Sequence, residues 1–430
     1  MSRQTNIELR KLFIYQVYIR NHTEEGTFKA FQKDLDRIEN LGVDIVYFLP
    51  IHPIGEVQRK GALGSPYSIQ DYRKINPEYG TLEDFKALVN EIHQRGMKVM
   101  IDVVYNHTSY DSKLLNEFPE YFYKEHGEFK NRVGDWWDIT DLDYSTSHRL
   151  WEELIDTLLY WTTLGVDGFR WDVASLLPME FLEEAHDKVL SVNPESIFLS
   201  ESVHGEFLRH IRNRGFLGLS ESEIYQVFDI AYDYDTHPLF EGYLNGDNTL
   251  KTYLTSILKQ EEQYPQNYIK LRNLENHDFG RFADMVDSNH VKIDNWSAFV
   301  FFNKGCTMIY AGQERSDTNL PSLFDKDPVH WDGYDVSSDI KTLASLVKDD
   351  IFTKGVYNFE YQDHDVIVAT YQLHQRLVVG IFNVGDETGK ITCSTVPNGV
   401  YQNLLDHSEI TVSNQTVAIT KKPIIFEVTL

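Results

Sequence analysis

Acidic side chains recur where short apolar segments of this sequence end. Asp102 lies near the end of one such segment, Asp172 and Glu201 close the next two, and Asp278 follows a later one. Several carboxyl groups gathered on one face of a fold are costly to desolvate, so their grouping indicates function. Such groups can attack a substrate, donate a proton or accept one. A single acid at a strand end would be explained equally well as a hydrogen-bonded structural group.

Asp172 and Glu201 end consecutive predicted strands, which lie side by side in a parallel sheet at ~4.8 Å. Retaining glycosidases hold two carboxyl groups ~5–5.5 Å apart, whereas inverting ones need ~6.5–9.5 Å, so this spacing favours retention. Arg170 precedes Asp172 by two residues, and its guanidinium is expected to keep Asp172 ionised. Glu201 is expected to have a raised pKa because other carboxylates lie near it, and so to hold the proton that the leaving oxygen needs. The alternative interpretation of Arg170 and Asp172 is an ion pair that only stabilises the strand.

Strand-like and helix-like segments alternate over the first three quarters of the chain. The predicted strands are Leu12–Tyr18, Ile45–Leu49, Lys98–Val104, Gly168–Val173, Ile197–Ser200, Ile224–Asp229, Ile269–Leu274 and Thr307–Tyr310. The predicted helices include Phe28–Leu41, Leu82–Arg95, His148–Leu164, Met179–Val192 and Leu250–Gln260. This alternation predicts an α/β fold with parallel strands, and a closed (β/α)8 TIM barrel leaves no edge strand. A doubly wound open sheet is the alternative, but no G-x-G-x-x-G sequence follows any strand.

Two stretches depart from the alternation. Residues 105–145 are long, aromatic and irregular, and we expect a short inserted loop subdomain over the C-terminal face of the barrel, where active sites are built. From about residue 351 strands follow without helices. We therefore predict a catalytic barrel of residues 1–104 and 146–350 and a C-terminal antiparallel β-sandwich domain of residues 351–430. Its predicted strands are Val366–Tyr371, Arg376–Ile381, Ile410–Val412, Val417–Ile419 and Ile424–Val428.

Four motifs in order resemble those of the α-amylase family of glycoside hydrolases. They are Asp102-Val-Val-Tyr-Asn106-His107, Gly168-Phe-Arg-Trp-Asp172-Val, Glu201 and Asn276-His277-Asp278. Three weaker matches agree, namely Gly64-Ser-Pro-Tyr67, Thr140-Asp-Leu-Asp143 and the segment from Gly305 to Glu314. The matches cover essentially the whole chain. The resemblance therefore implies a bacterial-type cytoplasmic α-amylase with a retaining mechanism.

The resemblance implies a catalytic role for three acids. Asp172 would attack the anomeric carbon, and Glu201 would protonate the glycosidic oxygen and later activate water. Asp278 would hold the sugar 2- and 3-hydroxyls and favour the distorted ring.

The resemblance also implies contacts around these acids. His107 and His277 would hydrogen-bond hydroxyls of the sugar at the cleavage site, and Tyr67 would stack on its face. Arg170 belongs to the same binding set, and Asp102 would support it.

Asn106 and Asp141 match calcium-ligand positions of the family. Two oxygen ligands fall short of the ~6–8 that Ca²⁺ takes, and Asn106 would serve equally as a hydrogen-bonding loop residue. We therefore expect no required cofactor, with a structural calcium ion as an open alternative.

The substrate expectation depends on one departure from the family pattern. Ser175 and Leu176 stand where many members carry Lys-His, and the inserted segment is short. We expect hydrolysis of α-1,4-glucosidic bonds in malto-oligosaccharides or soluble α-glucans. A transglycosidase or sugar isomerase would use the same carboxylates. A non-catalytic sugar-binding relative would usually have lost one of them, and a metal hydrolase would need paired His-x-His ligands that His107 and His277 lack.

Composition excludes several kinds of partner. The 430 residues carry a net charge of −26, from 40 basic and 66 acidic residues, so nucleic acid and membrane surfaces are not expected partners. Cys306 and Cys393 lie far apart in apolar or β-prone stretches and are predicted to be buried free thiols. No segment has the length of a membrane span and no apolar stretch follows Met1, so a cytoplasmic location is expected. The oligomeric state is left open.

Overall fold

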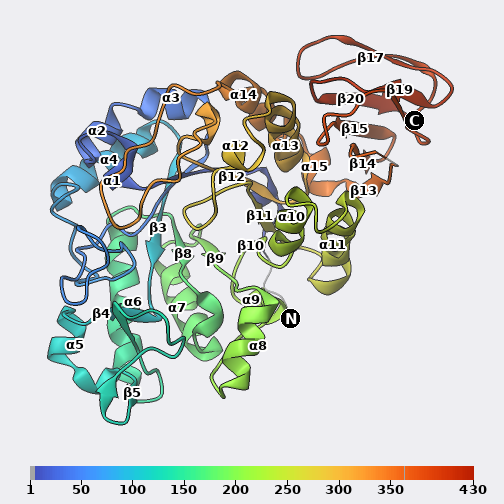
Figure 1. Cartoon of the computed structure of the whole chain (residues 1–430). Helices are drawn as coiled ribbons and strands as arrows, with labels where there is room; N and C mark the ends of the chain where they lie inside the picture. Colours follow the sequence, from blue (N-terminus) through green and yellow to red (C-terminus); the bar gives the residue numbers. More distant parts are fainter. Residues whose placement is uncertain (1–4, 363) are drawn as a thin grey trace.

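The computed structural model describes residues 5–362 and 364–430, and a closed barrel of parallel strands forms its centre (Figure 1). The barrel strands are β1 (Phe13–Val17), β2 (Ile45–Phe48), β3 (Lys98–Val103), β8 (Gly168–Trp171), β9 (Ile197–Ser200), β10 (Ile230–Tyr232), β11 (Lys270–Arg272) and β12 (Cys306–Tyr310). The barrel closes because β1 pairs with β2 on one side and with β12 on the other, as in Phe13 opposite Thr307. The predicted TIM barrel is confirmed.

The sixth barrel strand lies further along the chain than predicted. Most of the predicted segment Ile224–Asp229 is a turn, which follows the short helix α9 (Glu221–Ile224), and the strand is Ile230–Tyr232. The helix begins at a capping box in which Ser220 and Glu223 satisfy each other's backbone N–H groups. Ile224, Val227 and Phe228 are buried with the i, i+3, i+4 spacing of a helical turn. An apolar segment as short as this one can form either a helical turn or a strand, and for that reason the prediction was wrong here.

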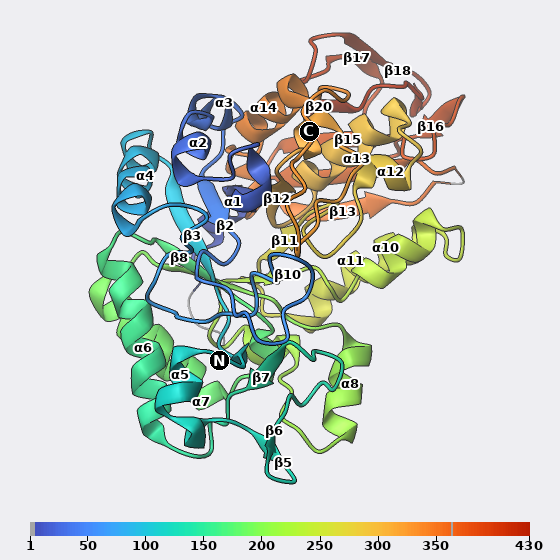
Figure 2. The ribbon, with the colours of Figure 1, turned by 60° about the vertical axis from the view of Figure 1, so that its left-hand side comes forward.

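Helices cover the outside of the barrel (Figure 2). The main ones are α4 (Leu82–Gln94), α6 (His148–Thr163), α7 (Met179–Val192), α10 (His237–Leu244), α11 (Leu250–Gln263), α13 (His290–Phe302) and α14 (Ser337–Leu346). The predicted helix Phe28–Leu41 is divided into α2 (Phe28–Gln32) and α3 (Leu35–Asn40). The N–H groups of Lys33 and Asp34 donate to carbonyls three residues earlier, which tightens the chain into a 3₁₀-type turn at the break.

The inserted segment after β3 is a small β-rich extension. It contains β4 (His107–Ser109), α5 (Lys113–Glu117), β5 (Lys124–Glu125), β6 (Glu128–Phe129) and β7 (Ile139–Asp141). β4 and β7 pair antiparallel, with His107 opposite Asp141. The segment therefore leaves the barrel beside the third strand and returns to the same place.

The C-terminal strands form an antiparallel sheet on one side of the barrel (Figure 1). Its order is β13 (Val356–Glu360), β14 (Ile367–Leu373), β15 (Arg376–Phe382) and β20 (Ile424–Thr429). Between β15 and β20 the chain forms two small two-stranded sheets, β16 (Lys390–Thr392) with β19 (Thr416–Ala418) and, between them in the chain, the hairpin of β17 (Gly399–Gln402) and β18 (Glu409–Val412). One face of the four-stranded sheet packs on α13, where Phe299 contacts Phe382, and the opposite face packs on the small two-stranded sheets. The predicted C-terminal antiparallel domain is confirmed.

Two simpler expectations also have structural answers. Cys306 and Cys393 are buried free thiols, as predicted. In the described part of the chain, none of the helices is long and apolar enough to cross a membrane.

Candidate active site

A cavity opens at the C-terminal ends of the barrel strands. Six of the predicted site residues line it: Tyr67, His107, Asp172, Glu201, His277 and Asp278. Its wall also includes Lys60, Ser65, Trp136, Asp138, Ile139, Val173, Leu323 and Phe324. Asp102 and Arg170 lie directly beneath these side chains and are fully buried. The structure thus brings all eight predicted catalytic, binding and supporting residues together.

Strand register sets the relation between Asp172 and Glu201. Trp171 on β8 is opposite Ser200 on β9, and each acid is the next residue along its strand. Backbone bonds extend the ladder past the strand ends, since the Asp172 N–H donates to Val103 O at 3.0 Å and the Glu201 N–H donates to Trp171 O at 3.0 Å. The two carboxyl groups therefore emerge from neighbouring strands at the same level.

A single guanidinium connects three acids. Arg170 Nη1 donates to Asp102 Oδ1 and to Asp172 Oδ1, both at 2.9 Å, and Nη2 forms an ion pair with Glu201 Oε2 at 3.1 Å. The Tyr47 and Tyr67 hydroxyls donate to Asp102 Oδ2 at 2.7 and 2.9 Å. Asp102 therefore acts through Arg170, whose orientation it fixes.

The charges in this cluster are not balanced. Burial and the Glu201 carboxylate raise the pKa of Asp172 well above its ordinary value, and Arg170 opposes this only in part. Burial likewise raises the pKa of Asp102 to about 6, against the effect of Arg170. Arg170 therefore acts on the pKa of Asp172 in the expected direction but is opposed by burial, and the ionised state of Asp172 stays a prediction. Asp102, Asp172 and Glu201 share this one guanidinium, so its single positive charge cannot neutralise all three carboxyl groups if each is ionised.

The backbone next to Asp172 is strained. Val173 has a φ of +37°, a left-handed conformation that a β-branched residue rarely adopts. In this conformation its N–H donates to Glu201 Oε2 at 2.7 Å. The strain therefore accompanies a hydrogen bond that fixes the second carboxyl group, as is common at functional sites.

His277 and Tyr67 form the opposite wall. The His277 ring stacks on Tyr67, with centroids 5.4 Å apart, and its Nε2 lies 2.7 Å from the Tyr67 hydroxyl and 3.3 Å from Asp278 Oδ2. The Gln16 amide nitrogen, 3.1 Å away, donates to Nδ1. Burial lowers the pKa of His277 to about 3, so the ring is neutral; with Nδ1 as acceptor it carries its proton on Nε2, which donates to the Tyr67 hydroxyl oxygen.

His107 lies on the side of the inserted segment. Its ring contacts the edge of Trp136, with centroids 5.6 Å apart, and burial lowers its pKa to about 3. Both predicted histidines are therefore neutral, which suits hydrogen bonding to uncharged hydroxyl groups.

Tyr234 is a site residue that the sequence did not reveal. Its hydroxyl donates to Asp278 Oδ2 at 3.2 Å and accepts a hydrogen bond from the Asn276 amide at 3.1 Å. Tyr234 stands two residues after β10. Because the prediction placed this strand six residues too early, nothing marked Tyr234 as a residue at a strand end.

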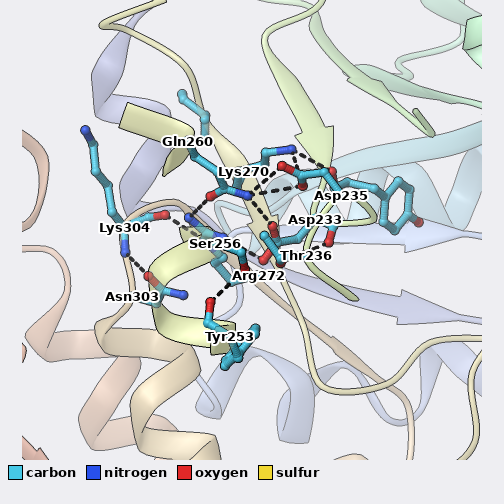
Figure 3. Close-up of polar contacts among 12 residues, drawn as sticks. Asp233, Asp235, Thr236, Tyr253, Ser256, Gln260, Lys270, Arg272, Asn303 and Lys304 are labelled. Atoms are coloured by element: carbon cyan, nitrogen blue, oxygen red, sulfur yellow. Dashed lines mark hydrogen bonds and ion pairs between the residues drawn. The ribbon is translucent and has the colours of Figure 1, made fainter. Parts of the chain in front are cut away.

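The residues on either side of Tyr234 belong to a buried ionic network (Figure 3). Lys270, fully buried on β11, forms ion pairs with Asp235 at 2.8 Å and with Glu221. Arg272 forms an ion pair with Asp233 at 2.5 Å and donates to Gln260. Gln260, from α11, also donates to Asp233 and Asp235. The network fixes the backbone on both sides of Tyr234.

We expect Tyr234→Phe to lower kcat/KM by about tenfold, the typical value of one hydrogen bond to a charged group, with little change in Tm. The loss of one donor lets Asp278 rotate away from the substrate. Steady-state kinetics on malto-oligosaccharides would measure the effect, with Tyr361→Phe, which alters an exposed tyrosine, as the matched control. Equal kinetics for both variants would show that Tyr234 does not position Asp278.

Asn106 and Asp141 lie behind His107, outside the cavity lining. The Asn106 amide nitrogen donates to Asp141 Oδ1 at 3.3 Å, and Asp141 Oδ2 accepts the Arg132 backbone N–H at 2.8 Å. The Arg132 guanidinium also contacts Asp141 Oδ2 at 3.4 Å. Among residues 5–362 and 364–430, no three His, Cys, Asp or Glu side chains are grouped to hold a metal. Because the acid already faces three nitrogen donors, this pair does not fit a calcium ion.

Family models match nearly the whole chain. "Alpha amylase, catalytic domain" matches residues 13–141 and 135–356, and "Bacterial Alpha amylase C-terminal domain" matches residues 358–426. The chain therefore belongs to the alpha-amylase family.

Solved structures agree over the full length. An alpha-amylase from Lactobacillus plantarum is 41% identical with a TM-score of 0.95, covering 99% of this chain and 100% of the other. A maltogenic alpha-amylase from Thermotoga neapolitana is 30% identical with a TM-score of 0.87, covering 98% and 100%. An alpha-1,4-glucan:maltose-1-phosphate maltosyltransferase of Picrophilus torridus is 29% identical over 51% of this chain and 39% of its own length. The chain spans less than half the length of the first curated relatives.

Proposed function

We propose that this chain is a retaining glycoside hydrolase that cleaves α-1,4-glucosidic bonds in malto-oligosaccharides or soluble α-glucans. The observation that carries the proposal is the pair Asp172 and Glu201, which end adjacent strands at the same level and share the Arg170 guanidinium. Neighbouring strands lie ~4.8 Å apart, close to the ~5–5.5 Å separation of carboxyl groups in retaining enzymes.

In the proposed reactive form Glu201 is protonated and Asp172 is ionised. Asp172 attacks the anomeric carbon while Glu201 gives its proton to the departing glycosidic oxygen, and a covalent glycosyl ester forms. In the second step Glu201 accepts a proton from water, the water oxygen bonds to the same carbon, and Asp172 leaves as the carboxylate. Arg170, held by Asp102, supports the negative charge that Asp172 carries before and after the ester.

The remaining side chains are proposed to bind the sugar at the cleavage point. Asp278, held by Tyr234, accepts hydrogen bonds from neighbouring ring hydroxyls. His277 Nε2 lies 3.3 Å from Asp278 Oδ2, and His107 lines the same cavity. The Tyr67 hydroxyl is already bound to Asp102 and His277, so its ring is fixed as a flat apolar surface for the sugar.

The acceptor side supports a preference for short substrates. Ser175 is buried, and its hydroxyl accepts the Val203 N–H at 3.2 Å. Leu176 lines a separate cavity with Ile211 and Phe216. Neither residue is placed to bind a sugar beyond the cleavage point, so the binding of the leaving part of the chain depends on other side chains.

Transglycosylation is the second candidate function. It is favoured by the similarity to maltosyltransferases, and it would use the same glycosyl ester with a sugar hydroxyl in place of water. Both cysteines are free and buried, as is typical of proteins in a reducing compartment, and on that ground we propose a cytoplasmic location.

The test is the product profile on maltoheptaose, with anomeric configuration followed by NMR and product length by chromatography. We expect the first signals to be α-anomers of shorter malto-oligosaccharides, because two displacements at one carbon restore the starting configuration. β-Anomers as first products would contradict retention. Dominant products longer than the substrate would replace hydrolysis by transglycosylation, and an inactive but folded protein would contradict both.

A further inference from the structure

Arg132 contacts Asp141, one of the two residues that the family resemblance assigns to a calcium ion. It belongs to the inserted segment, between β6 and β7. Its Nη1 donates to the Leu142 carbonyl at 2.8 Å and contacts Asp141 Oδ2 at 3.4 Å, and its own backbone N–H donates to the same Oδ2 at 2.8 Å. The Asp143 carboxylate lies 3.8 Å from Nη2. One guanidinium therefore faces three consecutive residues of the returning chain.

The surroundings keep the guanidinium in this position. Its carbon lies 4.5 Å from the centre of the Tyr123 ring, within the range of a cation–π contact. The Arg214 side chain, at the end of α8 (Gly205–Asn213), donates to the Arg132 and Val133 carbonyls at 2.6 and 2.9 Å. Arg132 is thus held from both its side chain and its backbone.

The charge balance also fits a guanidinium. Asp141 is almost fully buried, and an unpaired buried carboxylate is costly, so it needs a cation nearby. Asn106 turns its amide nitrogen, a hydrogen-bond donor, toward Asp141 Oδ1. A calcium ion would require the amide oxygen there, together with ~6–8 oxygen ligands in all.

This cross-link supports the wall of the active-site cavity. Trp136, Asp138 and Ile139 lie between Arg132 and Asp141 in the chain, and all three line the cavity. The Leu142 N–H donates to the Asn106 carbonyl at 2.9 Å, so the returning chain is fastened at the end of β3. The position of the wall therefore depends on Asp141 and the residues that neutralise it.

We infer that the Arg132 guanidinium is a built-in cation that takes the place of the calcium ion in this segment. The chain then needs no divalent metal to fold or to hold its active-site wall. The inference is independent of the proposed substrate, because it is tested first on thermal stability.

The experiment measures the Tm of the purified full-length chain after exhaustive dialysis against EDTA and again with millimolar CaCl₂. We expect the same Tm for the wild type in both conditions. Arg132→Ala should lower the Tm by several degrees in EDTA and regain part of it with calcium, because the freed oxygens become available to the ion. Arg132→Lys, which keeps a positive charge, should retain most of the wild-type Tm. Arg149→Ala, which removes an exposed arginine of α6, is the matched control.

Kinetics on maltoheptaose provide a second measure. Arg132→Ala should raise KM more than it lowers kcat, and calcium should reverse the change. A wild-type Tm that falls in EDTA would overturn the inference, even if Arg132→Ala fails to fold. The inference would also be overturned if Arg132→Ala had the same Tm and KM as the wild type, or if calcium changed neither the Tm nor the KM of that variant.

Discussion

Asp172→Asn is expected to reduce kcat on malto-oligosaccharides by on the order of 10⁴-fold or more, the loss typical of removing a catalytic nucleophile. Asparagine has nearly the same shape but forms no glycosyl ester under these conditions. The variant should fold as well as the wild type, because it removes one of three carboxyl groups around Arg170 and so relieves part of the unfavourable charge. Initial rates and a thermal unfolding curve measure the two effects separately.

Asp167→Asn is the matched control for this prediction. Asp167 precedes β8 at the opposite end of the barrel, where it accepts the Val99 N–H at 2.8 Å and contacts His93. The same chemical change there should leave kcat within a few-fold of wild type. If Asp172→Asn keeps a substantial part of kcat while its fold is intact, then Asp172 is not the nucleophile.

Lys270→Met is expected to give the largest loss of stability. It leaves Asp235 and Glu221 without their buried cation, and removing one partner of a buried pair costs about 3–5 kcal/mol. We expect a fall in Tm of roughly 3–6 °C, given the usual relation between stability and Tm for a chain of this length. Because Asp235 is next to Tyr234, kcat/KM should fall as well. Calorimetry and kinetics on one preparation measure both effects.

The control for Lys270 is Lys259→Met, which removes an exposed lysine of α11 and should change Tm little. A double variant sharpens the test. Asp235→Asn added to Lys270→Met removes one of the uncompensated charges and should restore part of the Tm, whereas Asp235→Asn alone should lower it. Additive losses in the double variant would show that the two residues do not stabilise each other.

Much of the fold could be predicted because the barrel strands carry strong local patterns. Seven of the eight predicted strands overlap the observed ones, and all five predicted C-terminal strands do so as well. The exception is the predicted strand Ile224–Asp229. Its apolar side chains are buried because the chain forms a helical turn there, and they do not alternate with exposed ones as in a strand. β13, β16 and β17 were also missed, because they are three to five residues long and half of their side chains are exposed.

The candidate site was predicted to the extent that its residues stand at strand ends. Asp172, Glu201 and Asp278 meet in the cavity because parallel strands deliver their C-terminal residues to one face. Their chemical roles remain predictions. Tyr234 and Arg132 act through contacts with chain segments distant in space or irregular in structure. No spacing in the sequence indicates that Arg132 contacts Asp141. This contact could be identified only from the folded structure of the inserted segment.

The closure of the barrel by β1 and β12 has a consequence for synthesis of the protein in the cell. Phe13 pairs with Thr307, so nearly 300 residues must be translated before the first strand meets its last neighbour. At about 5–20 residues per second, that interval is roughly 15–60 s, during which β1 has one unpaired edge. The apolar face of α13 stays uncovered even longer, because Phe382 and the rest of the sheet that packs on it are translated afterwards. The nascent chain therefore presents apolar surface to solvent for much of its translation, and chaperones that bind such surfaces have time to engage it.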